Sequence, residues 1–164
     1  MIGYRRQQQA EFSIPLLHMS EASTTKTLLL AEDDEDDYVL FCEAIKDFPA
    51  PLELHWVRNG EELMAALKQD KTDIIFLDIN MPLKNGFECL TEIRGDVQLK
   101  ETPVIIYSTS DDTKLIDWMY NAGANLYLCK PTDFKRLKSR ILKAISMDWQ
   151  KQTPFSQPGD FVLS

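Results

Sequence analysis

Five short apolar runs alternate with five segments of helical periodicity, and this alternation constrains the fold more than any other feature. The apolar runs cover residues 27–31, 52–57, 73–77, 103–107 and 126–129. Four of them are almost continuously apolar, as strands buried on both faces are. The run 52–57 (LELHWV) alternates in polarity, which predicts a more exposed strand at the edge of a sheet.

Between the runs, apolar residues recur at helical spacing in five segments. The predicted helices cover residues 36–48, 86–94, 112–122 and 134–147, and the remaining one begins at Asn59. Asn59 and Glu62 have the spacing of a capping box, and Gly95 and Gly123 are placed as C-terminal caps. Regular β-α alternation predicts a parallel sheet covered by helices on both faces. The predicted fold is therefore a flavodoxin-like (βα)5 three-layer α/β sandwich with strand order 2-1-3-4-5.

The repeating pattern occupies residues 26–148, which we interpret as one domain. Residues 1–25 are predicted to form a flexible N-terminal extension and residues 149–164 an irregular C-terminal tail. No apolar run approaches the ~18 residues that a membrane span needs. A net charge of −8 argues against direct DNA binding, and three cysteines without a CxxC pair indicate reduced thiols and a cytoplasmic setting.

Polar side chains follow the predicted strands where each strand ends. Glu32 and Asp33 follow the first run, Asp78 the third, Ser108 the fourth and Lys130 the fifth. Because the carboxyl ends of parallel strands share one edge of the sheet, these groups are expected to converge. Hard carboxylate oxygens favour Mg²⁺, Mn²⁺ or Ca²⁺, and an ammonium and a hydroxyl beside such an ion suit a phosphoryl group. An aspartate can accept that group as an acyl phosphate, and Asp78 is placed to do so.

Six consecutive acids occupy positions 32–37, which is unusual between two apolar segments. Glu32 and Asp33 are expected to be held by the cation. Asp34 to Asp37 fall at the start of a predicted helix, where the helix dipole stabilises negative charge. These four acids are therefore predicted to be a solvated helix start without a role in the chemistry.

The segments LLLAEDD, IIFLDINMPLKNGFE, PVIIYSTS and CKP occur in this order, and with them the chain resembles the receiver domain of two-component response regulators, of the single-domain, chemotaxis-regulator-like kind. The resemblance implies that Asp78 accepts a phosphoryl group from a histidine kinase. It implies that Asp33 binds Mg²⁺ directly, that Glu32 acts on the ion through water, and that Asn80 coordinates it through its backbone carbonyl; Mn²⁺ could replace Mg²⁺.

The same resemblance assigns four further roles. Ser108 corresponds to the switch hydroxyl, and Tyr127 to the aromatic residue that rotates when this hydroxyl is drawn to the phosphoryl group. Lys130 corresponds to the lysine that binds the phosphoryl group. The peptide bond between Lys130 and Pro131 is expected to be cis.

The expected function is a phosphorylation-driven switch rather than a turnover enzyme, one that catalyses only its own phosphotransfer and dephosphorylation. The implied partners are a sensor histidine kinase or phosphotransfer protein and a downstream protein; a homodimer is compatible with this, whereas DNA and membranes are not expected partners. The alternative is a haloacid-dehalogenase-type phosphohydrolase. That family requires a second aspartate two residues after the nucleophile, where this chain has Asn80. A third hypothesis is an interaction module that is not phosphorylated.

Overall fold

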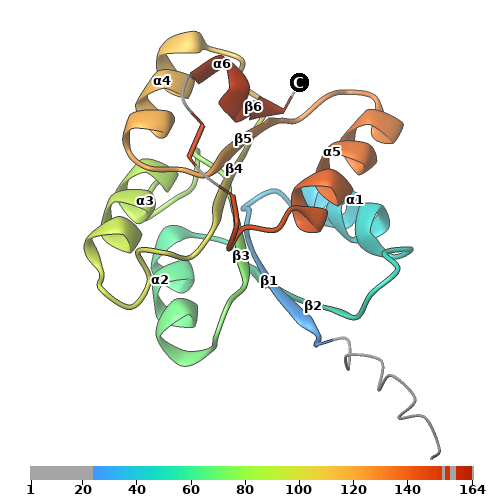
Figure 1. Ribbon diagram of the computed structural model, residues 1–164, viewed down its shortest axis with the longest axis horizontal. Helices are drawn as coiled ribbons and strands as arrows, with labels where there is room; N and C mark the ends of the chain where they lie inside the picture. Colours follow the sequence, from blue (N-terminus) through green and yellow to red (C-terminus); the bar gives the residue numbers. More distant parts are fainter. Residues whose placement is uncertain (1–23, 153, 156–157, 164) are drawn as a thin grey trace, which may run out of the picture.

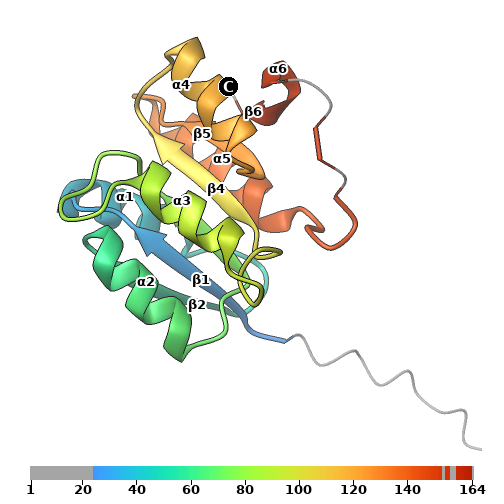
Figure 2. The same ribbon diagram turned by 90° about the vertical axis from the view of Figure 1, so that its left-hand side faces the viewer.

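The computed structural model describes residues 24–152, 154–155 and 158–163 of the 164-residue chain. Its centre is a six-stranded parallel sheet in the order β2-β1-β3-β4-β5-β6 (Figures 1 and 2). The strands are β1 (Lys26–Ala31), β2 (Leu52–Val57), β3 (Ile74–Leu77), β4 (Val104–Ser108), β5 (Leu126–Cys129) and β6 (Val162–Leu163). The predicted order of the first five strands is confirmed, and β2 lies at an edge as its alternating pattern indicated.

Helices cover both faces of the sheet (Figure 1). On one face lie α1 (Glu35–Ile45) and α5 (Phe134–Ser146), and on the other lie α2 (Gly60–Gln69), α3 (Gly86–Gly95) and α4 (Thr113–Asn121). Each of these five helices has an Asp or Asn N-cap, and the side chain of this residue accepts one or more hydrogen bonds from backbone N–H groups of the first turn. Among these caps, Asn85 forms a full capping box with Glu88 at the start of α3.

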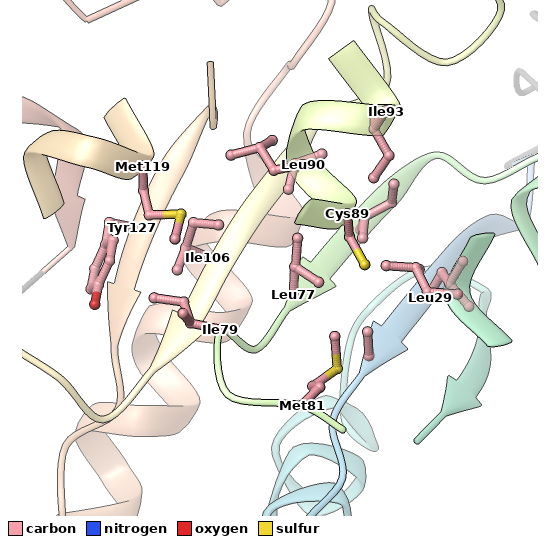
Figure 3. Close-up of a cluster of buried hydrophobic side chains, with 14 of the residues drawn as sticks. Leu29, Leu77, Ile79, Met81, Cys89, Leu90, Ile93, Ile106, Met119 and Tyr127 are labelled. Carbon is pink, nitrogen blue, oxygen red and sulfur yellow. The ribbon is translucent and has the colours of Figure 1, made fainter. Parts of the chain in front are cut away.

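Two hydrophobic clusters, one on each side of the sheet, form the core. The cluster drawn in Figure 3 joins β1, β3, β4 and β5 to α2, α3 and α4. The opposite cluster packs α1 and α5 on the sheet and contains the edge-to-face rings of Phe41, Phe76 and Tyr107. Complete burial of the central strands explains why their sequences show no alternation of polarity.

The C-terminal segment differs from the predicted irregular tail. Residues Pro158–Phe161 form the short helix α6, and Val162–Leu163 form β6, which pairs in parallel with β5. Figures 1 and 2 both show α6 and β6 beside α4 and β5. The Phe161 side chain is fully buried against the core, so this part of the tail belongs to the folded unit. The predicted flexible extension lies almost wholly outside the described residues.

One helix end also differs from the sequence prediction. Gly95 is the last residue of α3 and Asp96 is the cap, whereas Gly123, with φ of +92°, does close α4 in the left-handed region. The buried stripe of α4 is made by Ile116 and Met119, whereas the neighbouring Trp118 is 61% exposed. A stripe of adjacent apolar pairs leaves the helical phase ambiguous by one residue, and packing resolves it.

Candidate functional site at the carboxyl edge of the sheet

The groups predicted to converge are brought to one edge of the sheet by backbone hydrogen bonds between strand ends. The Asp78 N–H donates to the carbonyl of Ala31 at 2.9 Å, and the Lys130 N–H donates to the carbonyl of Ser108 at 2.7 Å. Glu32, Asp78 and Ser108 are all buried, which is rare for polar side chains without a structural or chemical role. The structure therefore places carboxylates from β1 and β3 beside groups from β4 and β5.

Glu32, Asp33 and Asp78 form a carboxylate cluster. Each offers one ligand oxygen, and these oxygens all lie within 4.8 Å of one another. Glu32 and Asp78 are buried, whereas Asp33 is exposed and leaves the cluster open to solvent. Three hard oxygen donors at this spacing fit a divalent cation of the Mg²⁺ or Mn²⁺ type, because such ions prefer carboxylate ligands and retain bound water.

The electrostatics of the cluster also favour a cation. Burial raises the pKa of Glu32 to about 7, although the hydrogen bond and charge of Lys130 oppose the shift. Burial likewise raises the pKa of Asp78, partly offset by Lys130 and by the N–H groups of Ile79 and Asn80. A bound cation would favour the charged forms of both carboxylates.

Lys130 is held by two carboxylates. Its Nζ lies 2.5 Å from Glu32 Oε2 and 2.8 Å from Asp37 Oδ2, and its side chain is only 6% exposed. The ammonium also lies 4.3 Å from the centre of the Tyr107 ring. Burial lowers the pKa of Lys130, but the charge of Asp78 and the hydrogen bonds to Asp37 and Glu32 outweigh this and raise it, so the ammonium stays charged at the site.

Asp37 was not predicted to take part in the site. Among the acids 34–37, Asp34 caps α1 by accepting hydrogen bonds from the N–H groups of Asp36 and Asp37. The Asp37 side chain instead turns back to Lys130. The sequence did contain a signal for this inward orientation of Asp37. The buried residues of α1 are Phe41 and Ala44, and extending their stripe back by one helical turn reaches position 37.

The Asp78 carboxylate is fixed by its own strand end. Its Oδ1 accepts a hydrogen bond from the Ile79 N–H at 2.7 Å. Asn80, two residues further on, is exposed beside the cluster. The assignment of its backbone carbonyl to the cation stays a prediction.

The two predicted switch residues are connected through Ser110. The Ser110 N–H donates to Ser108 Oγ at 3.2 Å, and the Tyr127 hydroxyl donates to the Ser110 carbonyl at 2.8 Å. The Tyr127 ring is fully buried. The position of the Ser108 hydroxyl and that of the Tyr127 ring are therefore linked through one short loop.

The prediction for Pro131 is wrong. Among the described residues no peptide bond is cis, so the bond between Lys130 and Pro131 is trans. The trans form is the lower-energy isomer of an X–Pro bond by roughly 0.5–1 kcal/mol, and here the chain enters the β5–α5 loop without the cis form. The Lys130 N–H still bonds to the carbonyl of Ser108, which positions the lysine at the edge.

Comparison with known proteins places this chain in one family. The model of the response regulator receiver domain matches residues 28–142. The response regulator Rcp1 of Synechocystis sp. is 32% identical over 136 residues, which are 79% of this chain and 92% of that protein. The transcriptional regulatory protein CrdR of Helicobacter pylori is 34% identical over 116 residues, but the chain spans only 54% of its length.

Solved structures agree with the sequence comparison. The Mn²⁺-bound form of Rcp1 has a TM-score of 0.70 at 31% identity, with 80% of this chain and 99% of that chain covered. The phosphorylated cyanobacterial phytochrome response regulator RcpA has a TM-score of 0.71 at 34% identity, with 82% and 100% covered.

The α/β fold and the matches to response regulators identify the class of this protein as a signalling domain that is controlled by phosphorylation. This chain belongs to the response regulator receiver domain family. It is thus a signalling protein of two-component systems, whose receivers take their phosphoryl groups from kinases, and the phosphohydrolase alternative gains no support. None of the helices within the described residues is both long and apolar enough to cross a membrane.

Proposed function

We propose that Asp78 is the phospho-acceptor of this receiver and that Lys130, Ser108 and the carboxylate pair Glu32 and Asp33 support the transfer. The observation that carries the proposal is the cluster of three carboxylates with ligand oxygens within 4.8 Å, next to a buried lysine. An Asp78 oxygen attacks the phosphorus of a phosphohistidine, the new P–O bond forms as the P–N bond breaks, and the imidazole keeps the electron pair.

The residues of this chain divide the work of the transfer. The Ile79 N–H holds one Asp78 oxygen at 2.7 Å and so orients the carboxylate. The Lys130 ammonium reaches the same edge and can neutralise charge on the phosphoryl oxygens, and the Ser108 hydroxyl can donate to one of them. Glu32, Asp33 and Asp78, with the Asn80 carbonyl, would hold Mg²⁺, which when bound supplies positive charge to the phosphoryl oxygens. Hydrolysis of the acyl phosphate by water at the same edge returns Asp78 to its carboxylate form.

Transfer changes the charge and shape of the edge, and we propose that the connected residues Ser108 and Tyr127 respond to it. A covalent ligand can bias a two-state element only if it contacts the two states differently. The hydroxyl of Ser108 provides such a difference, because it can bond either within the 108–110 loop or to a phosphoryl oxygen. A change at Tyr127 would then be read by a downstream protein partner.

The donor to test first is a phytochrome-type histidine kinase, because the relative RcpA is a phytochrome response regulator. Transfer of a phosphoryl group from such a kinase to this chain would support this choice of donor. Transfer from an unrelated histidine kinase alone, under the same conditions, would reject this choice of donor without affecting the acceptor assignment.

The acceptor is tested with radiolabelled acetyl phosphate and Mg²⁺. Wild-type protein should be labelled, and Asp78→Asn should not, because the amide cannot form an acyl phosphate. Asp111→Asn is the matched control, since Asp111 is an exposed aspartate outside the cluster, and it should be labelled normally. Full labelling of Asp78→Asn would remove the acceptor assignment, and omission of Mg²⁺ should abolish wild-type labelling.

A further inference from the structure

The described C-terminal residues 154–155 and 158–163, which we name the C-terminal strap, lie against the residue that the proposed switch moves. Its strand β6 pairs with β5 so that Val162 is opposite Tyr127. The Phe161 ring lies 6.2 Å from the Tyr127 ring and 5.5 Å from the Tyr120 ring, measured between ring centres. The Tyr120 hydroxyl donates to the Phe155 carbonyl at 2.6 Å, which ties the strap to α4 as well.

The strap has little structure that could persist by itself. Its helix is a single turn and its strand has two residues, and elements of this size are unstable without tertiary contacts. Burial of the Phe161 ring between α4 and β5 is therefore the main source of its order. An element of such low intrinsic stability responds readily to a change in the surface on which it lies.

The contacts form one path from the site to the strap. The Ser108 hydroxyl accepts from the Ser110 N–H, and the Ser110 carbonyl accepts from the Tyr127 hydroxyl. The Tyr127 ring packs on Phe161. If the Ser108 hydroxyl turns toward a phosphoryl group on Asp78, it releases the Ser110 N–H, and the loop that holds the Tyr127 hydroxyl can move. A shift of the Tyr127 ring would then weaken its contact with the Phe161 ring.

We propose that the chain's own strap is an autoinhibitory segment, held on the edge of β5 and the adjoining face of α4 by its pairing with β5 and by Phe161, and that phosphorylation of Asp78 weakens this docking. The surface holds the Phe161 ring at the end of a single helical turn and pairs with the two-residue strand Val162–Leu163. This inference rests on the proposed acceptor role of Asp78.

Docking and phosphorylation must influence each other equally, because coupling between two sites is reciprocal. Beryllium trifluoride with Mg²⁺ serves as a non-covalent phosphoryl probe, so that the coupling can be measured at equilibrium. Phe161→Ala should bind this probe more tightly by roughly 5-fold or more, the lower end of usual coupling between sites. Tyr120→Phe, which removes only the hydroxyl that bonds to Phe155, should shift the affinity in the same direction.

Two controls separate coupling from general loosening of the fold. Asp160→Ala changes an exposed strap residue and should leave the probe affinity at the wild-type value. In a Tyr127→Ala background, Phe161→Ala should have no further effect on the probe affinity, because the path from the Ser110 carbonyl through Tyr127 to the strap is already lost. Wild-type affinity in both Phe161→Ala and Tyr120→Phe would overturn the inference.

Amide hydrogen exchange of the peptide containing residues 158–163 gives a direct reading of the strap. Exchange should become faster when the probe and Mg²⁺ are added, and unchanged or slower exchange would contradict the inference. A dependence of this exchange on protein concentration would assign the surface to the strap of a second copy and overturn docking within one chain.

If wild-type protein were not labelled by acetyl phosphate, the acceptor proposal itself would fail. Normal labelling with an unresponsive strap would reject only this inference.

Discussion

At the scale of single residues, the position of Lys130 depends on a pair of carboxylates from different parts of the chain. Glu32 also belongs to the carboxylate cluster that would hold the cation, so Lys130 is not its only partner. Asp37 lies outside that cluster, and its Oδ2 lies 2.8 Å from the lysine Nζ. Asp37 is therefore a positioning residue that can hold Lys130 near the edge while Glu32 faces a cation.

Asp37→Asn should slow phosphorylation by acetyl phosphate roughly 10-fold, because hydrogen bonds to charged groups contribute about 1.5–3 kcal/mol. Asp36→Asn is the matched control, since it removes the same charge from an exposed neighbour in α1, and its rate should be that of the wild type. The initial rate of labelling at fixed Mg²⁺ measures the effect. Equal rates in the two variants would show that Asp37 does not position the lysine.

At the scale of elements, α3 begins directly against the chain segment that carries the acceptor. The Gly86 N–H donates to the carbonyl of Ile79 at 2.9 Å, and Asn85 caps the helix with Glu88. A Cβ at position 86 would lie 2.4 Å from the Asp78 carbonyl oxygen. Only glycine permits this approach, so the start of α3 fixes the backbone immediately after Asp78.

Gly86→Ala should destabilise the protein by about 1–3 kcal/mol, the usual cost of forcing extra atoms into a packed region. Gly95→Ala, at the other end of the same helix, meets no heavy atom within 4 Å. It should be neutral or stabilising by up to about 1 kcal/mol, because alanine is the better helix former. Urea unfolding of both variants measures the difference, and equal stabilities would contradict the close approach at position 86.

At the scale of the whole molecule, the net charge of −8 is accompanied by buried carboxylates at one edge of the sheet. The folded protein holds the proton of Glu32 more tightly than the unfolded chain does, because burial raises its pKa from 4.5 to about 7. The contribution of the protonated form to stability is fully present below pH 4.5 and is lost as the pH rises through about 7.

In the presence of a chelator, the free energy of unfolding of the wild type should therefore decrease between pH 5 and pH 8, roughly the window between the two pKa values. Glu32→Gln should flatten this decrease, whereas Glu61→Gln, at an exposed position of α2, should not. Mg²⁺ at about 100 times its dissociation constant should restore about 2.7 kcal/mol at the upper pH. Chemical denaturation with and without Mg²⁺ tests both parts, and an unchanged slope in Glu32→Gln would contradict the assignment.

Local patterns were sufficient for much of the fold and for the chain positions that meet at the site. The four almost continuously apolar runs predicted strands buried on both faces, and the alternating run 52–57 predicted the more exposed edge strand, because burial of one or both faces determines the polarity pattern of a strand. The topology of parallel strands then placed the residues that follow them at one edge.

The sequence by itself determined the (βα)5 order and the convergence of Glu32, Asp33, Asp78, Ser108 and Lys130, because both follow from periodicity and strand counting. Tertiary structure alone decided that Asp37 pairs with a lysine 93 positions away and that Val162 and Leu163 add a sixth strand to the sheet. The physical reason is that these contacts join segments too short or too distant to leave a local pattern. Their free energy comes from packing and charge that exist only once the sheet has assembled.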